Sequence, residues 1–381
     1  MGHDGEVHGP LVRQVELVQV AMVLRSPIVT AYGTEHERDV ALVRVVTDDG
    51  DGWGECAALP EPTYSTEYVA GALHVLEHHL VPRLLGAPAH EAAADALLAP
   101  VVGHPMAKAA LEMALLDARL RAAGRSLAAE LGAELGVERN AVSRVAVGRT
   151  LGLQRDVGRL RAEAAQAVAA GYRHLKLKVT PGWDREPVAA VRSDHPGLSI
   201  GVDANGSYDP LAPGALDPLD DLGLVVIEQP LPVDHDDAHG RLAARLRTPV
   251  ALDEDVTSVD RGGRLLRQLG LAAVVAKPGR LGGLRAAAAL GRSVGGRAWV
   301  GGMYETGIGR AANLALAACT DAFGLPVDWS ASDRYWEVDL TAPHVLGPDG
   351  TIAVPGGPGL GVSVDERALA GRVRQRRLLS A

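Results

Sequence analysis

The chain has 381 residues, with 38 Lys and Arg against 47 Asp and Glu, which gives a net charge of -9. An acidic chain without a long basic run lacks the electrostatic surface that nucleic acids require, so we expect a small-molecule partner and no nucleic acid. Apolar runs fall well short of the roughly 18 residues of a membrane helix, and MGHDGEVHGP lacks the basic and apolar regions of a signal peptide, so we expect a cytoplasmic protein without a membrane partner.

The first third of the chain predicts a small domain of strands and helices. Two β-rich runs, VELVQVAMVL and DVALVRVVT, flank a polar loop at residues 26–38, and a DDGDGWGE turn leads into a third short segment. This pattern predicts an antiparallel meander. Residues 63–85 and 104–124 carry apolar residues at three- and four-residue spacing, which predicts helices. We therefore expect an α+β capping domain over residues 1–137.

From residue 142 onward, short β-branched runs alternate with helical segments. Strands that alternate with helices form parallel sheets, and seven or eight such units close into a barrel. We therefore expect an α/β fold with a (β/α)7β TIM-type barrel over residues 138–340, and residues 341–381 packing back on the capping domain. An open doubly wound sheet would need a G-x-G-x-x-G loop after its first strand, and none stands there. The expected strands are VSRVAVG, RHLKLKV, LSIGVDA, LVVIEQP, PVALDED, AAVVAKP and RAWVGGM.

One charged residue stands near the C-terminal end of each middle strand. The intervals between these residues are nearly constant: 203 − 178 = 25, 228 − 203 = 25, 253 − 228 = 25 and 277 − 253 = 24. One βα unit per interval brings all of them to the same end of the sheet, where barrel enzymes keep their active sites. The five residues are Lys178, Asp203, Glu228, Asp253 and Lys277.

Lysine is rare in this chain, because only four of its 38 basic residues are lysines. An arginine keeps its proton in a protein, whereas a lysine can act as a base. Lys178 and Lys277 flank the three carboxylates, so we expect them to face each other as two opposed bases. Lys176 shares a strand face with Lys178, and its charge, together with a bound metal, should lower the pKa of Lys178 toward neutrality.

Asp203, Glu228 and Asp253 would repel one another at an apolar barrel mouth unless a cation neutralised them. A ligand set made only of carboxylate oxygens suits Mg²⁺ or Mn²⁺ rather than zinc. A divalent cation on a substrate carboxylate would stabilise the charge that forms when a base removes the α-proton. These residues therefore predict metal-dependent proton abstraction from a small-molecule carboxylate. A barrel that binds metal and ligand without turnover is the alternative, and the two lysines argue against it.

Short motifs at the strand ends carry a family resemblance. K-L-K at 176–178, V-D-A-N at 202–205, I-E-Q-P at 227–230, L-D-E at 252–254 and K-P-G-R at 277–280 resemble the muconate-lactonizing-enzyme subgroup of the enolase superfamily. KVTPGWD, GGMYETGIGRAANLALA and SASDRYW are similar to the N-succinylamino acid racemase and o-succinylbenzoate synthase family. GWGEC and AKAALEMALLDARLR extend the likeness into the capping domain, so it spans nearly the full chain.

This resemblance implies that three carboxylates hold Mg²⁺ and that lysines move the proton. The implied reaction is racemisation of N-acyl, in particular N-succinyl, amino acids. Synthesis of o-succinylbenzoate by dehydration, or another cycloisomerase or epimerase reaction of the subgroup, stays open. We also expect a homo-oligomer. The implied catalytic residues are Lys178 and Lys277, with Lys176 assisting Lys178, and the implied metal ligands are Asp203, Glu228 and Asp253.

Further residues are implied around the metal and the substrate: Asn205, Glu254, Arg280, Tyr304, Glu305 and Tyr64. Of these, Arg280 stands at a position associated with the racemases of the family. Three features depart from the family pattern, and we expect all three to touch substrate. Ile28-Val29 replaces Phe-Arg in the first loop, Ala146 replaces Ser on the first barrel strand, and Tyr304 replaces an aliphatic residue.

Three other patterns in the sequence each have a plainer interpretation. HVLEH at 74–78 matches the H-x-x-E-H pattern of one metalloprotease class, but a surface helix with solvated histidines is the better interpretation. His235 and His239 are expected in a solvated acidic loop rather than a second metal site. Tyr64 and Tyr68 either close the barrel mouth as a lid or serve only as packing residues.

Overall fold

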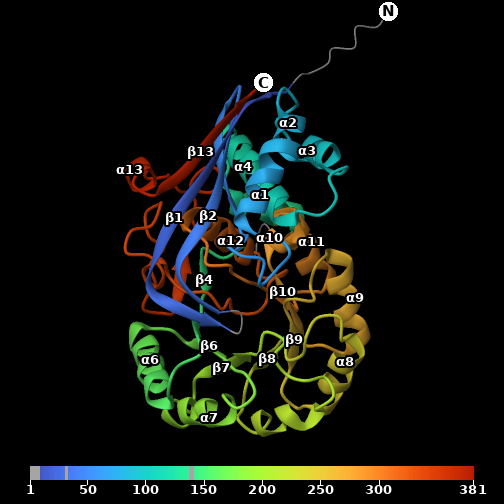
Figure 1. The fold of residues 1–381 in the computed structure, drawn as a ribbon, viewed down its shortest axis with the longest axis vertical. Coiled ribbons are helices and arrows are strands. Elements are labelled where there is room, and N and C mark those ends of the chain that lie inside the picture. Colours follow the sequence, from blue (N-terminus) through green and yellow to red (C-terminus); the bar gives the residue numbers. More distant parts are fainter. Residues whose placement is uncertain (1–8, 31–32, 137–140) are drawn as a thin grey trace, which may run out of the picture.

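An antiparallel sheet of four strands, in the order β13-β1-β2-β3, stands beside the barrel (Figure 1). The computed structural model describes residues 9–30, 33–136 and 141–381. The last strand of the chain pairs with β1 from Gln14↔Ser380 to Val20↔Val373, so both ends of the chain join one sheet. The strands are β1 Val12–Thr30, β2 Gly33–Thr47, β3 Gly50–Cys56 and β13 Val373–Ser380.

The polar loop predicted at residues 26–38 is wrong, because β1 and β2 continue through most of it. After a shift in register beyond Val23, Ile28 pairs with Glu35 and Val29 with Thr34. The polar composition has a different cause from a loop. Polar residues at this end of the hairpin line a cavity described below.

Both predicted helical stretches of the capping domain are present, although the first is divided by a π-helical turn. The longest helix, α4, packs closely on β3, because Gly52 and Gly54 leave no side chain between the strand and the backbone of Ala110 and Ala114. The helices are α1 Val69–Val75, the π-helix η1 Leu76–Leu80, α2 Val81–Leu84, α3 Glu91–Leu98, α4 Pro105–Ala122 and α5 Leu127–Leu135.

Seven parallel strands form the second sheet, in the order β11-β10-β9-β8-β7-β6-β5, and the sheet curls into a barrel-like arc. Residues 327–329 approach both of its ends, because Gly148 N donates to Val327 O (2.7 Å) and Trp329 Nε1 donates to Val300 O (2.9 Å). The strands are β5 Arg149–Leu151, β6 His174–Lys178, β7 Ser199–Asp203, β8 Val226–Glu228, β9 Val250–Leu252, β10 Ala273–Ala276 and β11 Ala298–Val300.

The first predicted barrel strand, VSRVAVG, is wrong. Its central residues form β4 (Arg144–Ala146), which pairs antiparallel with β12 (Thr351–Ala353) in a separate sheet. Only Val145 of this strand is buried, whereas its two neighbours are exposed. This alternation suits a half-buried antiparallel pair better than a parallel strand that is covered on both faces. The barrel begins at β5, immediately after this run.

Helices line the outside of the curled sheet (Figure 1). The prediction of a helix between every two strands fails between β7 and β8, where a 3₁₀ helix, η2 Pro213–Leu219, contains Pro213 and Pro218. Proline lacks the amide donor that a longer α-helix would need. The other helices are α6 Val157–Ala170, α7 Arg185–Asp194, α8 Asp236–Arg245, α9 Val259–Leu269, α10 Pro278–Leu281, α11 Leu284–Ser293, α12 Gly307–Ala317, η3 Ser332–Arg334 and α13 Glu366–Ala370.

The domain boundary predicted at residue 137 lies outside the described residues, and the predicted division into 1–137, 138–340 and 341–381 stays a prediction. Across the part of the chain that the structure describes, no helix combines the length and the apolar character needed to traverse a bilayer.

Buried glutamates of the capping domain bind the N-termini of two barrel helices. Glu55, at the end of β3, accepts hydrogen bonds from Thr306 N (3.0 Å), Thr306 Oγ1 (2.6 Å) and Gly309 N (2.9 Å) at the start of α12. Glu112 of α4 accepts from Leu284 N (2.5 Å) at the start of α11. A carboxylate at a helix N-terminus satisfies free amides and favours the helix dipole. These contacts tie the capping domain to the barrel.

Glu55 makes the stability of the protein depend on pH. Burial raises the pKa of its carboxyl group from 4.5 to about 7. As the pH rises from about 4.5 to about 7, the unfolded chain loses a proton that the folded chain keeps, so the free energy of unfolding falls. We expect Glu55→Gln to reduce this fall, measured from denaturation midpoints at about pH 5 and about pH 7.5. The exposed Glu366→Gln is the control, and an unchanged fall in Glu55→Gln would contradict the assignment.

Candidate active site

The predicted row of charged residues lies at one end of the curled sheet. Lys178 pairs in register with Asp203, and Asp203 pairs with Glu228, so these three side chains project from neighbouring strand ends. Asp253 and Lys277 follow directly after β9 and β10. Register-paired residues of parallel strands project from the same face of the sheet. The nearly constant interval in the sequence therefore does bring these residues to one end of the sheet.

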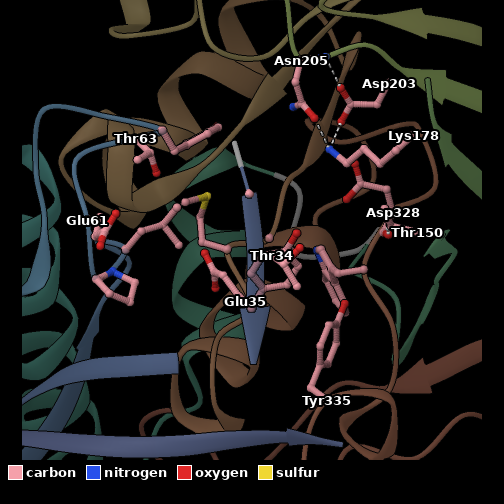
Figure 2. A pocket seen from close by; sticks show the side chains of 18 of the residues that line it. Thr34, Glu35, Glu61, Thr63, Thr150, Lys178, Asp203, Asn205, Asp328 and Tyr335 are labelled. Atoms are coloured by element: carbon pink, nitrogen blue, oxygen red, sulfur yellow. Dashed lines mark hydrogen bonds and ion pairs between the residues drawn. The ribbon is translucent and has the colours of Figure 1, made fainter. Parts of the chain in front are cut away.

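A cavity of 360 Å³ opens above this row, and three lysines line it: Lys176, Lys178 and Lys277. Asp203, Asn205 and Asp328 lie beside them in its wall, and Figure 2 shows Lys178 pointing toward Asp203 and Asn205. The volume is typical of a pocket for a small molecule. Glu228 and Asp253 lie beneath this surface and are almost fully buried.

Lys176 lies among three carboxylates. Its Nζ is 2.5 Å from Asp328 Oδ2, 3.0 Å from Glu228 Oε2 and 3.2 Å from Asp203 Oδ2. Burial lowers the pKa of Lys176, but the charges of these three carboxylates together raise it well above its ordinary value. In these contacts Lys176 is held as a positive charge.

Lys178 donates to Asp203 Oδ2 (2.7 Å) and to Asn205 Oδ1 (2.7 Å). Burial lowers the pKa of Lys178, and the charge of Lys176 lowers it further, as predicted. The charge of Asp203, with smaller contributions from Tyr304 and Glu228, acts in the opposite direction and outweighs both. Without a metal the pKa of Lys178 therefore lies above its ordinary value, and the predicted fall, which includes the charge of a bound metal, stays a prediction.

Lys277 belongs to a closed ring of hydrogen bonds. Its Nζ donates to Asp253 Oδ2 (2.7 Å) and to Tyr64 Oη (2.7 Å). Arg280 donates to the other oxygen of Asp253 (2.5 Å) and to the same Tyr64 Oη (2.6 Å). Tyr64 comes from the loop between β3 and α1, so the capping domain contacts a candidate base directly. Tyr68, by contrast, is exposed at the start of α1.

The residues predicted as metal ligands fit a divalent cation in chemistry and charge. The cluster contains five carboxylates but only four cationic side chains, so it carries an excess of negative charge. Burial, and to a smaller extent the charge of Asp203, raises the pKa of Glu228 well above its ordinary value. Each predicted ligand contacts an ammonium or a guanidinium group here, and no three His, Cys, Asp or Glu of the described residues converge as a metal site. The carboxylates are Asp203, Glu228, Asp253, Glu254 and Asp328, and the cations are Lys176, Lys178, Lys277 and Arg280.

Two residues of this wall escaped the prediction. Asp328 contacts Lys176 and also accepts from Trp299 Nε1 (3.0 Å). Thr150, on β5, lines the cavity and donates to Asp328 O (2.8 Å). The interval along the chain could have located Asp328, because 302 − 277 = 25 and 328 − 302 = 26. The residue at the intermediate position, Gly302, is uncharged, so a search for regularly spaced charged residues stops at Lys277.

Of the three departures from the family pattern, only Tyr304 lines the cavity. Ala146 does not, because it lies in β4 outside the curled sheet, and Val29 directs its carbonyl toward Leu153 N (3.2 Å). Neither Val29 nor Ala146 is among the residues that line this cavity, and the expectation that they touch substrate stays a prediction.

The remaining predicted residues lie at the margin of the site. Asn205 donates to Glu254 Oε1 (2.9 Å), and both residues line a second cavity on the far side of Tyr64. Glu305 lies outside the main cavity, where it accepts from Asn313 Nδ2 (2.9 Å) and pairs with Arg310 (3.3 Å).

The histidine patterns form no metal site among the described residues. His74 and His78 are exposed, with ring centroids 4.6 Å apart, as the surface-helix interpretation predicts. His239 is fully buried in α8 and its Nε2 accepts from Leu231 N (3.3 Å). The prediction of a solvated loop is therefore wrong for His239, because the first turn of α8 turns this residue inward, while His235 is exposed.

Comparisons with known proteins cover almost the whole chain. Residues 12–132 match the mandelate racemase / muconate lactonizing enzyme N-terminal domain, and residues 159–368 match the enolase C-terminal domain-like family. An N-succinylamino acid racemase from Amycolatopsis sp. is 44% identical over 358 residues, which cover 92% of this chain and 94% of that protein. An o-succinylbenzoate synthase from Geobacillus kaustophilus is 38% identical over 362 residues, which cover 93% and 94%.

Solved structures agree with this assignment. An enolase-superfamily member from Listeria innocua superimposes with a TM-score of 0.89 at 31% identity, over 97% of this chain and 99% of that chain. These findings confirm the resemblance predicted from the motifs. The chain belongs to the muconate-lactonizing subgroup of the enolase superfamily and is an enzyme related to the N-succinylamino acid racemases and o-succinylbenzoate synthases.

Proposed function

We propose that this enzyme racemises N-acyl amino acids by two-base proton transfer. The observation that carries the proposal is that Lys178 and Lys277 line one cavity from strands that three other strands separate. The 44% identity with an N-succinylamino acid racemase supports the same reaction. Racemisation needs one group to remove the α-proton and another to return a proton to the opposite face, and two separated lysines meet this need.

The surrounding residues divide the remaining work. Lys176, held as a cation by three carboxylates, favours negative charge in the cavity. Asn205 and Asp203 orient the ammonium of Lys178, whereas Tyr64 and Asp253 orient that of Lys277. Asp203, Glu228 and Asp253 would hold Mg²⁺, which when bound would stabilise charge on the substrate carboxylate.

Synthesis of o-succinylbenzoate is the second candidate, because a synthase is 38% identical over nearly the whole chain. Arg280, at a position associated with racemases, bonds to Asp253 and Tyr64 beside Lys277, which favours the racemase. NMR of α-proton exchange with N-succinyl and N-acetyl amino acids, run beside a synthase assay, separates the two. Exchange without synthase turnover is the expected result, and synthase turnover without exchange would reverse the assignment.

The lysines give the sharpest mutational test. We expect Lys178→Ala and Lys277→Ala each to reduce racemisation by about a hundredfold or more, because each removes one of the two proton-transfer groups. Lys108→Ala is a matched control, since Lys108 lies on α4 and donates to Val101 O outside the site. Circular dichroism checks the fold of each variant. Full racemisation by either site variant would refute the two-base mechanism.

Removal of metal is expected to abolish activity reversibly. After thorough chelation, racemisation should fall to background and return when Mg²⁺ is added. A thermal unfolding scan gives a readout independent of activity, because an ion that binds only the folded chain raises the midpoint. We expect Mg²⁺ to raise it in the unaltered enzyme and much less in Asp253→Asn. Undiminished activity in the chelated enzyme would contradict the role of the three carboxylates.

A further inference from the structure

The two sides of the cavity differ in charge. Lys176, Lys178 and Lys277 line the side formed by the barrel together with Asp203 and Asp328. The side formed by the capping domain is lined by Glu35, Glu37 and Glu61 and, among the described residues, by no lysine or arginine. Figure 2 shows Glu35 and Glu61 on the side of the cavity away from Lys178. Glu37 is already neutralised by an ion pair with Arg374. Glu61 is exposed to water, and solvent screens the effect of such a charge.

Glu35 differs from Glu61 because it is half-buried, and from Glu37 because it forms no ion pair among the described residues. Its Oε2 is buried and has no hydrogen-bond partner among the described residues. The charge of Arg38 acts on Glu35, while the hydrogen bonds of its guanidinium go to Ala58 O (2.8 Å) and Ala57 O (3.2 Å). A buried carboxylate oxygen without a partner is costly, and a cation placed against it would remove that cost.

Aromatic side chains make up much of the wall between the two sides. Tyr64, Tyr304, Trp329 and Tyr335 all line the cavity, although the whole chain has only seven Tyr, five Trp and one Phe. Aromatic faces attract ammonium and guanidinium groups, and more strongly where water is excluded. The rings of Tyr64, Trp329 and Tyr335 already lie near Lys277, Arg310 and Arg334 of the protein. The wall therefore suits the apolar stem of a long side chain, and Glu35 is the group that would meet its charged end.

We propose that Glu35 selects substrates with a positive charge remote from the α-carboxylate, so that the enzyme prefers N-acylated basic amino acids such as Nα-acyl-lysine. This inference rests on the proposed racemase function. The α-carboxylate takes the lysine side of the cavity, and the side-chain ammonium takes the side of Glu35. A second carboxylate directed at Glu35 would be repelled.

Two substrates that differ only in the distal charge test the proposal. Nα-acetyl-lysine and Nα-acetyl-norleucine share the carbon chain up to the terminal group, and α-proton exchange gives kcat/KM for each. We expect the unaltered enzyme to prefer the lysine derivative by about tenfold, as for a partly buried ion pair. In Glu35→Gln this preference should fall to about unity, and in Glu35→Lys the lysine derivative should become the poorer substrate.

Glu37→Gln is the matched control, because it removes the same charge from the same strand at a residue that Arg374 already neutralises. It should keep the preference for the lysine derivative. Equal kcat/KM for the two substrates in the unaltered enzyme, or a preference that survives in Glu35→Gln, would overturn the role of Glu35. Failure of the racemase function looks different, because the unaltered enzyme would then exchange the α-proton of neither substrate nor of N-succinyl amino acids.

Discussion

The site depends on a cluster of buried opposite charges at the end of one parallel sheet. Lys176 alone contacts Asp203, Glu228 and Asp328, and Asp253 contacts Lys277 and Arg280. Taking charges out of water is expensive, and removing one partner of a buried pair costs about 3–5 kcal/mol. The cluster is therefore stable only as a set, in which each side chain is held by its neighbours. This constraint fixes the positions of the candidate bases before any substrate enters.

The capping domain completes the site, and buried carboxylates of this domain also join it to the barrel. Tyr64 reaches Lys277 from the loop between β3 and α1, and Glu35 reaches the cavity from the β1–β2 hairpin. Glu55 and Glu112 bind the N-termini of α12 and α11 through buried carboxylates. The domain is thus anchored at helix ends while its strand ends and loop form one wall of the cavity.

The row of charges could be predicted from the sequence, because the spacing of these residues follows a regular feature, the length of a βα unit. Asp203 and Glu228 stand exactly one unit apart and pair in register. Thr150 and Asp328 were missed because they lie where this regularity is weakest. The strand at Thr150 is short and follows a β-branched run that pairs elsewhere, and Asp328 lies on a segment with a single backbone bridge to the neighbouring strand.

In the β1–β2 hairpin, a local sequence pattern gave the wrong secondary structure. Residues 26–38 are polar enough to suggest a loop, yet Ile28 and Glu35 are paired across two strands. Polar residues suit these strands because one face borders a cavity, which no local pattern reports. The pKa of Lys178 is likewise hard to predict from the local sequence, because the direction of its shift depends on Asp203, a residue one βα unit away in the sequence.

The division of the cavity between two domains would allow one set of candidate proton-transfer residues to serve different reactions. The lysines and carboxylates stand on strand ends of the barrel, where each is fixed by several others, so a change in one disturbs the rest. Glu35 stands on a hairpin of the capping domain and shares no ion pair with that cluster among the described residues. A substitution there changes the charge met by the far end of a substrate while the lysines keep their partners. Substrate choice can therefore diverge on the hairpin while the barrel residues retain their chemistry.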